Sequence, residues 1–240
     1  MKCVIMQPTF FPWAGYFYLA SQADVFVFLD DVQLEKQSWQ TRNCILLNGK
    51  AAWISVPLIH MGSEQKICEV EVFDQSLWRI KLLRKLAQTY ARHPFCDVML
   101  KGANLLGGMS ETHLADINIL LITDFCNRFG IQPRFARSSR LGISGDRTER
   151  LIRICEHFGC QEYLSPAGSA DYLAQDRFTE RTNIRLSLQK YEAQVYPQYR
   201  SNAFISHLSV IDVVANLGWD GGARYVRGET IGTEPAKTYP

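Results

Sequence analysis

Short apolar runs and helical stretches alternate at the start of the chain. Residues 2–6 and 24–30 are nearly continuous apolar runs, rich in β-branched and aromatic side chains, which predicts two buried strands. Pro12 suits the first turn of a helix that we expect over residues 13–22. A strand, a helix and a second strand in so few residues predict a right-handed βαβ unit with parallel strands.

The pattern changes after this unit. Two apolar runs at 42–47 and 51–57 flank Asn48-Gly49, a dipeptide typical of a tight antiparallel hairpin. A long helical stretch follows, and then strands and helices alternate again as far as a short helix at 209–217. The chain therefore combines a parallel α/β arrangement with an added antiparallel piece.

The helical stretch covers residues 76–129, and Ser110 is the expected N-cap of its last helix. We expect the α/β class, with a Rossmann-like, mainly parallel sheet, an antiparallel hairpin and a helical insertion at about 76–129. This fold should form one α/β domain over residues 1–218. Glycine, threonine and proline dominate afterwards, so residues 219–240 are expected to be a loose C-terminal tail.

Composition narrows the class of protein. With 47% hydrophobic and 21% charged residues, the chain is typical of soluble globular proteins, and it has no run long enough for a membrane span and no signal sequence. We therefore expect a cytoplasmic protein. The seven cysteines are scattered without a CxxC pair, and no histidines are spaced i, i+4, so neither a disulfide framework nor a zinc site is indicated. The sequence does not identify a cofactor.

Two adjacent acids, Asp30 and Asp31, follow the second buried strand. In open α/β sheets the carboxyl ends of the strands are where ligands bind. Gln7 follows the first strand, so we expect it to line the main cleft together with both aspartates and at least one of Trp39, Arg42 and Asn43. An aspartate there is a candidate general base, and the alternative is that it only caps a turn.

A cluster of arginines lies between residues 128 and 153. Its strand-loop-helix turn brings Ser138, Arg140 and Arg150 together near a helix N-terminus, a place that attracts anions. The alternative is a solvated basic face. A nucleic-acid groove is not expected, because the basic stretch is short and lacks regular aromatic interleaving.

Two further groups have an open interpretation. The small-residue loop from Ser165 to Gly168 follows a predicted strand, so it either lets a ligand approach the backbone or only forms a tight connection. The aromatic residues of the first helix, including Trp13 and Tyr16, are core residues by default, although one or two could form a platform for a sugar or nucleoside.

Several segments of the chain closely resemble the WbqC-like family. They are residues 6–17 (with the run Gln-Pro-Thr-Phe-Phe-Pro-Trp), 28–33, 38–43, 53–57, 78–90, 114–118, 163–173 and 208–212. The resemblance covers roughly residues 3–218, and its N-terminal block is highly specific. It implies a transferase of bacterial surface-polysaccharide (O-antigen) biosynthesis, with glycyl or aminoacyl transfer to an amino sugar as the expected reaction.

This reaction requires a small-molecule substrate, which we expect to be a sugar nucleotide, and an aminoacyl donor or carrier protein. The candidate catalytic residues are Asp30 and Asp31. The candidate substrate-binding residues are Gln7, Trp13, Tyr16, Gln33, Trp39, Arg42, Asn43, Ser138, Arg140, Arg150, Ser165 and Gly168.

Three alternatives stay open. An acyl group could pass through a cysteine, although Cys3 and Cys44 lie within predicted strands, and a reactive thiolate needs partial exposure and a cationic neighbour. The opening of the chain is also similar to that of the HIGH-motif nucleotidyltransferases, with Trp13 and Tyr16 in the places of that motif's histidines. The third alternative is a noncatalytic sugar-binding or assembly protein of the same pathway.

Overall fold

The computed structural model describes residues 1–59, 64–145, 147–199, 201 and 203–231. Within these residues one sheet contains five parallel strands, in the spatial order β5-β2-β1-β6-β7. The strands are β1 (Lys2–Met6), β2 (Val25–Phe28), β5 (Arg134–Arg137), β6 (Glu162–Ser165) and β7 (Arg185–Leu188). Together with a separate antiparallel hairpin and the helices, this sheet confirms the predicted Rossmann-like α/β class.

The strand order reverses between β1 and β6. From β1 the chain moves outward to β2 and β5, and it then crosses back to β6 on the other side of β1. In open α/β sheets the crevice at such a switch point is the preferred ligand site. β1 and β6 therefore mark where the loops beyond their carboxyl ends, at Gln7 and Pro166, would meet a ligand.

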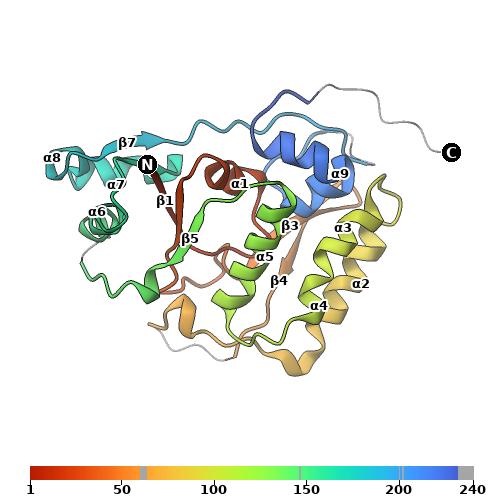
Figure 1. Ribbon diagram of the computed structural model, residues 1–240. Coiled ribbons are helices and arrows are strands. Elements are labelled where there is room, and N and C mark those ends of the chain that lie inside the picture. Colours follow the sequence, from red (N-terminus) through yellow and green to blue (C-terminus); the bar gives the residue numbers. More distant parts are fainter. Residues whose placement is uncertain (60–63, 146, 200, 202, 232–240) are drawn as a thin grey trace.

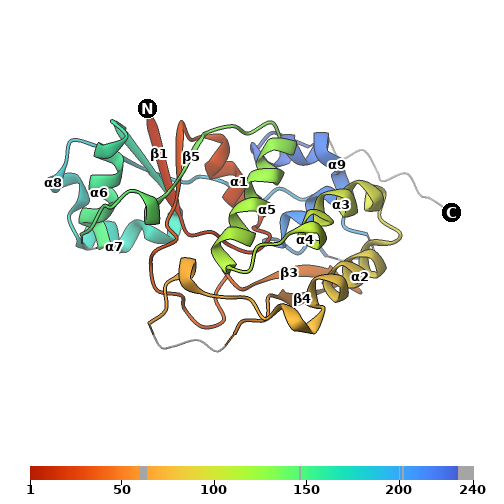
Figure 2. The same ribbon diagram turned by 60° about the horizontal axis from the view of Figure 1, so that its bottom comes forward.

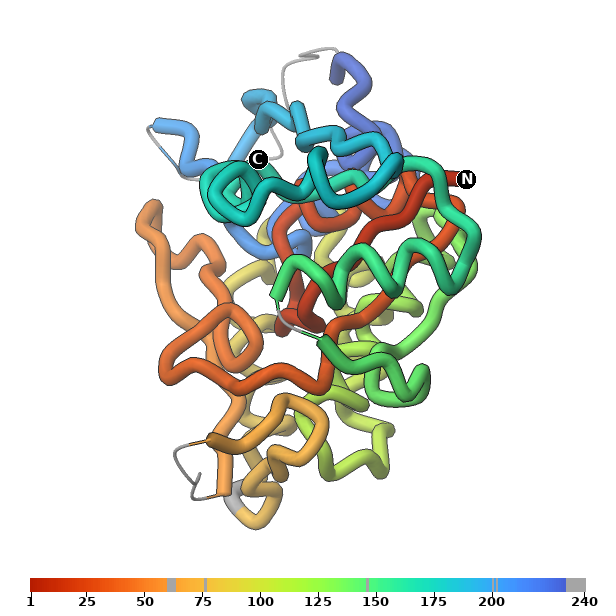
Figure 3. Tube along the Cα trace, turned by 90° about the vertical axis from the view of Figure 1, so that its left-hand side faces the viewer, coloured from red at the N-terminus to blue at the C-terminus, as the bar shows by residue number. Residues whose placement is uncertain are grey.

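Helices cover both faces of the sheet (Figures 1 and 2). The helices α1 (Ala14–Ser21), α5 (Leu114–Arg128) and α9 (Val210–Val226) lie on one face. The helices α6 (Arg147–His157), α7 (Ala170–Gln175) and α8 (Phe178–Arg181) lie on the other and are nearest the viewer in Figure 3.

Alternating residues of the strands supply the two cores. Val4 and Phe26 belong to the core under α1, α5 and α9, whereas Cys3 and Val25 belong to the core under α6, α7 and α8. Because successive side chains point to opposite faces of a strand, continuous apolar runs are needed to fill both cores. This requirement explains why β1 and β2 could be predicted from their runs.

The hairpin consists of β3 (Arg42–Leu47) and β4 (Lys50–Ser55). Asn48 and Gly49 both have positive φ, 52° and 73°, as a two-residue turn of this kind requires. The insertion beside it contains α2 (Trp78–Tyr90), α3 (Cys96–Ala103) and α4 (Leu105–Gly108) before α5.

The helix α5 begins at Leu114 and not after Ser110, so the predicted N-cap is wrong. The N–H of Leu114 donates to Val70 O at 2.8 Å, and the N–H of Val72 donates to Thr112 O at 2.8 Å. These bonds hold the residues before Leu114 extended against a neighbouring segment, and they delay the start of the helix.

The expected loose tail is partly helical, which corrects the prediction. The helix α9 has non-helical angles at Gly218, φ 68° and ψ −171°, but it then continues to Val226. Trp219 packs against Phe125 and Phe129, with ring centroids 5.2 and 5.3 Å apart, and this burial favours helix after the glycine. Residues 232–240 of that tail lie outside the described part of the chain.

No helix among the described residues has the length and apolar character needed to cross a membrane.

Candidate functional site

The carboxyl ends of three neighbouring strands bring the predicted acids and the predicted arginine-serine turn together. Register pairs Met6 with Phe28 and Phe28 with Arg137, so the residues that follow β1, β2 and β5 share one edge. There the N–H of Asp30 donates to Ser138 Oγ at 3.1 Å. Two groups that the sequence suggested as separate sites therefore form one.

Asp30 is fully buried and its carboxylate is saturated with donors. Arg137 Nε donates to Oδ2 at 2.7 Å, and Ser139 donates from its N–H to Oδ1 at 3.0 Å and from its Oγ to Oδ2 at 2.8 Å. Burial alone would raise the pKa of Asp30, but the bonds from Ser139 and Arg137 outweigh it and lower the pKa below its ordinary value. Asp30 is thus held ionised and has no room for a substrate.

Asp31 is the more accessible of the two, with 19% of its side chain exposed. One carboxylate oxygen accepts from Ser138 Oγ and the other pairs with the Arg150 guanidinium. The side chain of Ser138 is itself buried. The place where we expected an external anion to meet Ser138 and Arg150 is therefore occupied by the protein's own carboxylate.

Arg137 extends this cluster to α5 and was not among the predicted site residues. Besides Asp30, it pairs with Asp116, which lies on the first turn of α5. We call Asp30, Asp31, Asp116, Arg137 and Arg150 the acid–arginine network. It contains three carboxylates and two guanidinium groups. The arginine cluster between residues 128 and 153 was the sequence signal for Arg137, and nothing local to Asp116 indicated its partner.

Arg140 is exposed and has no hydrogen-bond or ion-pair partner among the described residues. It follows Ser138 and Ser139 in the short helical turn η3 (Ser138–Arg140) after β5. Since Arg137 and Arg150 already face carboxylates, Arg140 is an exposed cation at this edge that is open to an incoming anion.

Gln7 lies beside the network, at the end of β1. Its side-chain Oε1 accepts from Gln40 Nε2, and its backbone O accepts from Tyr16 Oη at 3.1 Å. Tyr16 is only 2% exposed, so it positions Gln7 from the core and does not present a platform to a ligand. Asn118 Nδ2 donates to Pro8 O at 3.1 Å and to Gln40 O at 2.8 Å, which fixes the same loop to α5.

Trp39 and Arg42 form an exposed surface with a residue that the sequence did not single out. The rings of Trp39 and Trp53 are 5.6 Å apart, and both residues are about half exposed (51% and 47%). The Arg42 guanidinium lies over the Trp53 ring, 4.2 Å from its centroid. We call these three residues the tryptophan–arginine platform. Asn43, by contrast, is buried and donates to Phe10 O and Phe11 O at 3.1 and 2.8 Å, so its role is structural.

The chain matches the WbqC-like protein family over residues 7–223. The protein belongs to the WbqC-like family. It is 30% identical over 221 residues to the uncharacterized protein Rv1507c of Mycobacterium tuberculosis, a match that covers 90% of this chain and 94% of that relative. No solved structure matches the chain.

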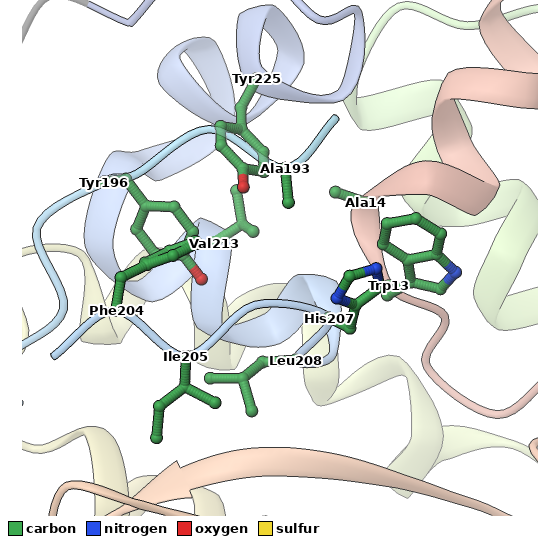
Figure 4. A pocket seen from close by; sticks show the side chains of 10 residues that line it. All are labelled: Trp13, Ala14, Ala193, Tyr196, Phe204, Ile205, His207, Leu208, Val213 and Tyr225. Carbon is green, nitrogen blue, oxygen red and sulfur yellow. The ribbon is translucent and has the colours of Figure 1, made fainter. Parts of the chain in front are cut away.

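Trp13 of this WbqC-like protein lies apart from the network. Its ring packs on His207, with centroids 4.5 Å apart, and on Tyr191 at 5.6 Å, and it lines a cavity of about 10 Å³, enough for one water molecule (Figure 4). The ring also covers Gly15, where an added Cβ would come within 2.2 Å of it. Trp13 therefore packs between the start of α1 and the residues His207 and Tyr191, and it does not face the network.

Three predicted residues remain, namely Ser165, Gly168 and Gln33. Ser165 is fully buried, with its Oγ 3.4 Å from Tyr163 Oη. Gly168 is exposed, and an added Cβ there would meet nothing within 4 Å, so the folded chain itself does not require a glycine. Gln33 is exposed and forms a β-bridge with Lys66.

A second cavity, of about 350 Å³, lies at the hairpin turn. Neither it nor the small cavity under Trp13 is lined by Gln7, Asp30 or Asp31. Their expected place in the main cleft stays a prediction.

Cys68 is the cysteine that touches the network, through an N–H that donates to Asp30 O at 2.8 Å. Burial raises the pKa of its thiol, and the nearby carboxylates of Asp30, Glu69 and Asp31 raise it further. Burial likewise raises the pKa of Cys44. Because the thiolate is the nucleophile, these environments work against a covalent route.

Among the described residues, no three His, Cys, Asp or Glu side chains are grouped so as to hold a metal ion.

Proposed function

We propose that this protein is a transferase of bacterial surface-polysaccharide (O-antigen) biosynthesis that moves an aminoacyl group, such as glycyl, to the amine of an amino sugar carried as a sugar nucleotide. The observation that carries the proposal is Asp31, a partly exposed carboxylate after β2 that pairs with Arg150 of α6 and accepts from Ser138, which begins the turn containing Arg140. Membership of the WbqC-like family supports the pathway.

Asp31 would act as the general base. The acceptor ammonium must lose a proton before its nitrogen can attack the acyl carbonyl, and a carboxylate within hydrogen-bond reach can accept that proton. The new C–N bond then forms as the bond between the carbonyl carbon and the donor's leaving group breaks. Asp31 first has to release one partner, because Ser138 and Arg150 hold both of its oxygens.

A phosphate on the substrate provides a way to release it. Arg150 pairs with Asp31, and a substrate phosphate would compete for the same guanidinium. Arg140, which is exposed, would supply the second positive charge. Binding of the sugar nucleotide would thereby free an Asp31 oxygen next to the acceptor amine.

Asp30 has a different part in this proposal. Its saturated carboxylate holds Arg137 and the turn at Ser139, so it is a positioning residue rather than a proton acceptor. The tryptophan–arginine platform offers flat apolar faces that suit the base or the sugar ring of the substrate.

The test is to incubate the protein with aminoacyl donors and candidate amino-sugar nucleotides and to follow product mass. Asp31→Asn keeps size and shape but removes basicity, so turnover should fall by about 10²–10⁴-fold. Asp24→Asn is the matched control, because Asp24 lies at the opposite end of the same strand, where it accepts from the N–H of Lys2 at 2.6 Å. Full activity in an Asp30→Asn, Asp31→Asn double variant would exclude a carboxylate base. No product from any donor would favour the noncatalytic binding protein.

A second candidate, nucleotidyl transfer, is favoured by the strand order, which places a switch point after β1. Tyr16 and Trp13 stand where the HIGH motif has histidines, but the hydroxyl of Tyr16 is bound to Gln7 O and the ring of Trp13 packs on His207. Neither is placed to stabilise phosphate charge. Pyrophosphate release from a nucleoside triphosphate in the same incubations would revive this candidate.

A further inference from the structure

The cavity at the hairpin turn has the composition of a ligand site. Its volume of about 350 Å³ lies at the lower end of the range for small-molecule pockets. The cavity is formed by the turn of the β3–β4 hairpin, the C-terminal part of α2 and the residues just after that helix. Its described lining residues are Leu46, Leu47, Asn48, Lys85, Gln88, Thr89, Ala91, Arg92, His93 and Tyr199.

His93 is the unexplained group in this wall. It is 7% exposed, and neither ring nitrogen has a hydrogen-bond partner among the described residues. Buried polar atoms are nearly always paired, since an unpaired one costs the free energy of its lost hydration. The ring is fixed between Tyr90 and Tyr199, with centroids 4.7 and 5.1 Å away. His93 lines the cavity, and its two buried ring nitrogens are polar atoms of that wall for which the described chain supplies no partner.

The imidazole is neutral at physiological pH. Burial lowers the pKa of His93 to about 4; the Tyr90 carbonyl lies nearby and offsets part of this effect, without the geometry of a hydrogen bond. A neutral imidazole has one N–H that donates and one nitrogen that accepts. The missing partner must therefore supply both an acceptor and a donor.

The charges of the wall are of one sign. Lys85 and Arg92 line the cavity, and none of its described lining residues is acidic. Lys85 Nζ donates to Trp53 O at 3.0 Å and keeps further donor capacity, while Arg92 is exposed and has no ion-pair partner among the described residues. Arg92 follows the C-terminus of α2 and also interacts favourably with the helix dipole, whereas Lys85 lies more than one turn before that end. They still leave a net positive wall beside His93.

We propose that this cavity binds a small organic anion, one that carries a phosphate or carboxylate together with a hydroxyl, with Lys85 and Arg92 holding the charge and His93 recognising the hydroxyl. No residue of the acid–arginine network lines this cavity. Arg42, at the start of β3, belongs to the tryptophan–arginine platform, and Leu47, at its end, lines the cavity, about 17 Å away at the rise of an extended strand.

The test follows the histidine ring resonances of the full chain by NMR during titration with ribose 5-phosphate, gluconate and inorganic phosphate. We expect a saturable shift of the His93 resonances with at least one of the first two probes, and the comparison between them shows whether phosphate or carboxylate is preferred. Lys85→Ala and Arg92→Ala should each weaken binding about tenfold, as expected for the loss of one charge-assisted hydrogen bond. Lys81→Ala is the matched control, because Lys81 is exposed on the same helix and does not line the cavity.

His93→Phe keeps the ring between the two tyrosines and removes its polar atoms, so it should retain a cooperative thermal transition and lose the binding. The proposal is overturned if the His93 resonances do not move with any of the three probes. Equal affinities in Lys85→Ala, Arg92→Ala and Lys81→Ala would also overturn it, because the bound anion would then lie elsewhere.

Discussion

Two aspartates of this chain are equally buried, but their surroundings shift their pKa values in opposite directions. Asp30 at the sheet edge and Asp212 on α9 both have fully buried side chains. Asp30 accepts from the Arg137 guanidinium at 2.7 Å and from a backbone N–H at 3.0 Å, and its pKa is lowered. Asp212 accepts from Tyr196 Oη at 2.6 Å and Tyr90 Oη at 3.1 Å and forms no ion pair among the described residues.

Burial raises the pKa of Asp212 to about 6, and its hydrogen bonds from Tyr196 and Tyr90 offset only part of that rise. Burial therefore does not by itself decide whether a carboxylate is charged. Neutral hydroxyls lower the cost of a buried negative charge, whereas a guanidinium and an N–H at the same distances remove it. At neutral pH both carboxylates are mainly ionised, but its lowered pKa keeps Asp30, at the sheet edge, charged over a wider pH range.

The largest effect is expected at Asp30. Asp30→Ala leaves Arg137 with Asp116 alone and removes the acceptor for Ser139, so the free energy of unfolding should fall by about 3–5 kcal/mol. Urea denaturation at neutral pH measures it. Asp24→Ala, at the other end of β2, is the matched control and should cost much less, because Asp24 is exposed.

The pH dependence of this variant sharpens the same point. A carboxyl group with a lowered pKa in the folded state contributes stability above its ordinary pKa of 3.8, and that contribution is lost as the pH falls through the lower folded value. The difference between wild type and Asp30→Ala should therefore shrink below about pH 4. A difference that stays constant into acid would mean that Asp30 contributes packing and not charge.

Asp212→Asn should give the opposite trend. The folded pKa of about 6 lies above the ordinary value of 3.8, so the folded state binds the extra proton between these values and wild-type stability falls as the pH rises through them. Asparagine does not ionise. The stability of Asp212→Asn relative to wild type should thus increase from pH 5 to pH 8, by roughly 1–2 kcal/mol.

Urea denaturation of both proteins at the two pH values measures this change. Asn216→Asp at the next turn of α9 is not a suitable control, since it adds a charge; Asn118→Asp has the same defect. Thr123→Val, on the solvent side of α5, leaves both aspartates untouched and should show no such trend. A constant difference between Asp212→Asn and wild type would break the contrast with Asp30.

The sequence predicted the local features of the sheet edge but not the contacts between distant residues. The strands β1 and β2 were predictable because a strand buried on both faces needs a continuous apolar run, and the position of Asp30 at the carboxyl end of β2 followed directly. Its partner Arg137 is 107 residues away, and only the order of strands in the sheet makes them neighbours. The acids and the arginine-serine turn were consequently predicted as two sites that turned out to be one.

Asp212 shows what periodicity alone misses. It interrupts the apolar run Val210-Ile211-Asp212-Val213-Val214, and a lone acid among buried positions was a local signal for it. Its partners Tyr90 and Tyr196 come from α2 and from an irregular segment, so their identity required the packed structure. The second half of α9 also required the packed structure. Its glycine-rich sequence did not predict a helix, and the packing of Trp219 stabilises one.

The smallest effect tests the hydroxyls around Asp212. Tyr196→Phe removes a hydrogen bond of 2.6 Å to the ionised carboxylate, so the pKa of Asp212 should rise further above 6, and the stability cost at neutral pH should be about 1–2 kcal/mol. Tyr90→Phe is the matched comparison, with a longer bond of 3.1 Å to the other oxygen and an additional contact from the N–H of Leu46 at 3.4 Å. Carboxyl carbon NMR across a pH titration reads the pKa directly. An upward shift in both variants, larger for Tyr196→Phe, would establish that neutral donors hold part of this charge. No shift in either variant would mean that the tyrosine hydroxyls do not affect the pKa of Asp212, and the difference from Asp30 would then rest on burial and on the donors from Arg137 and Ser139.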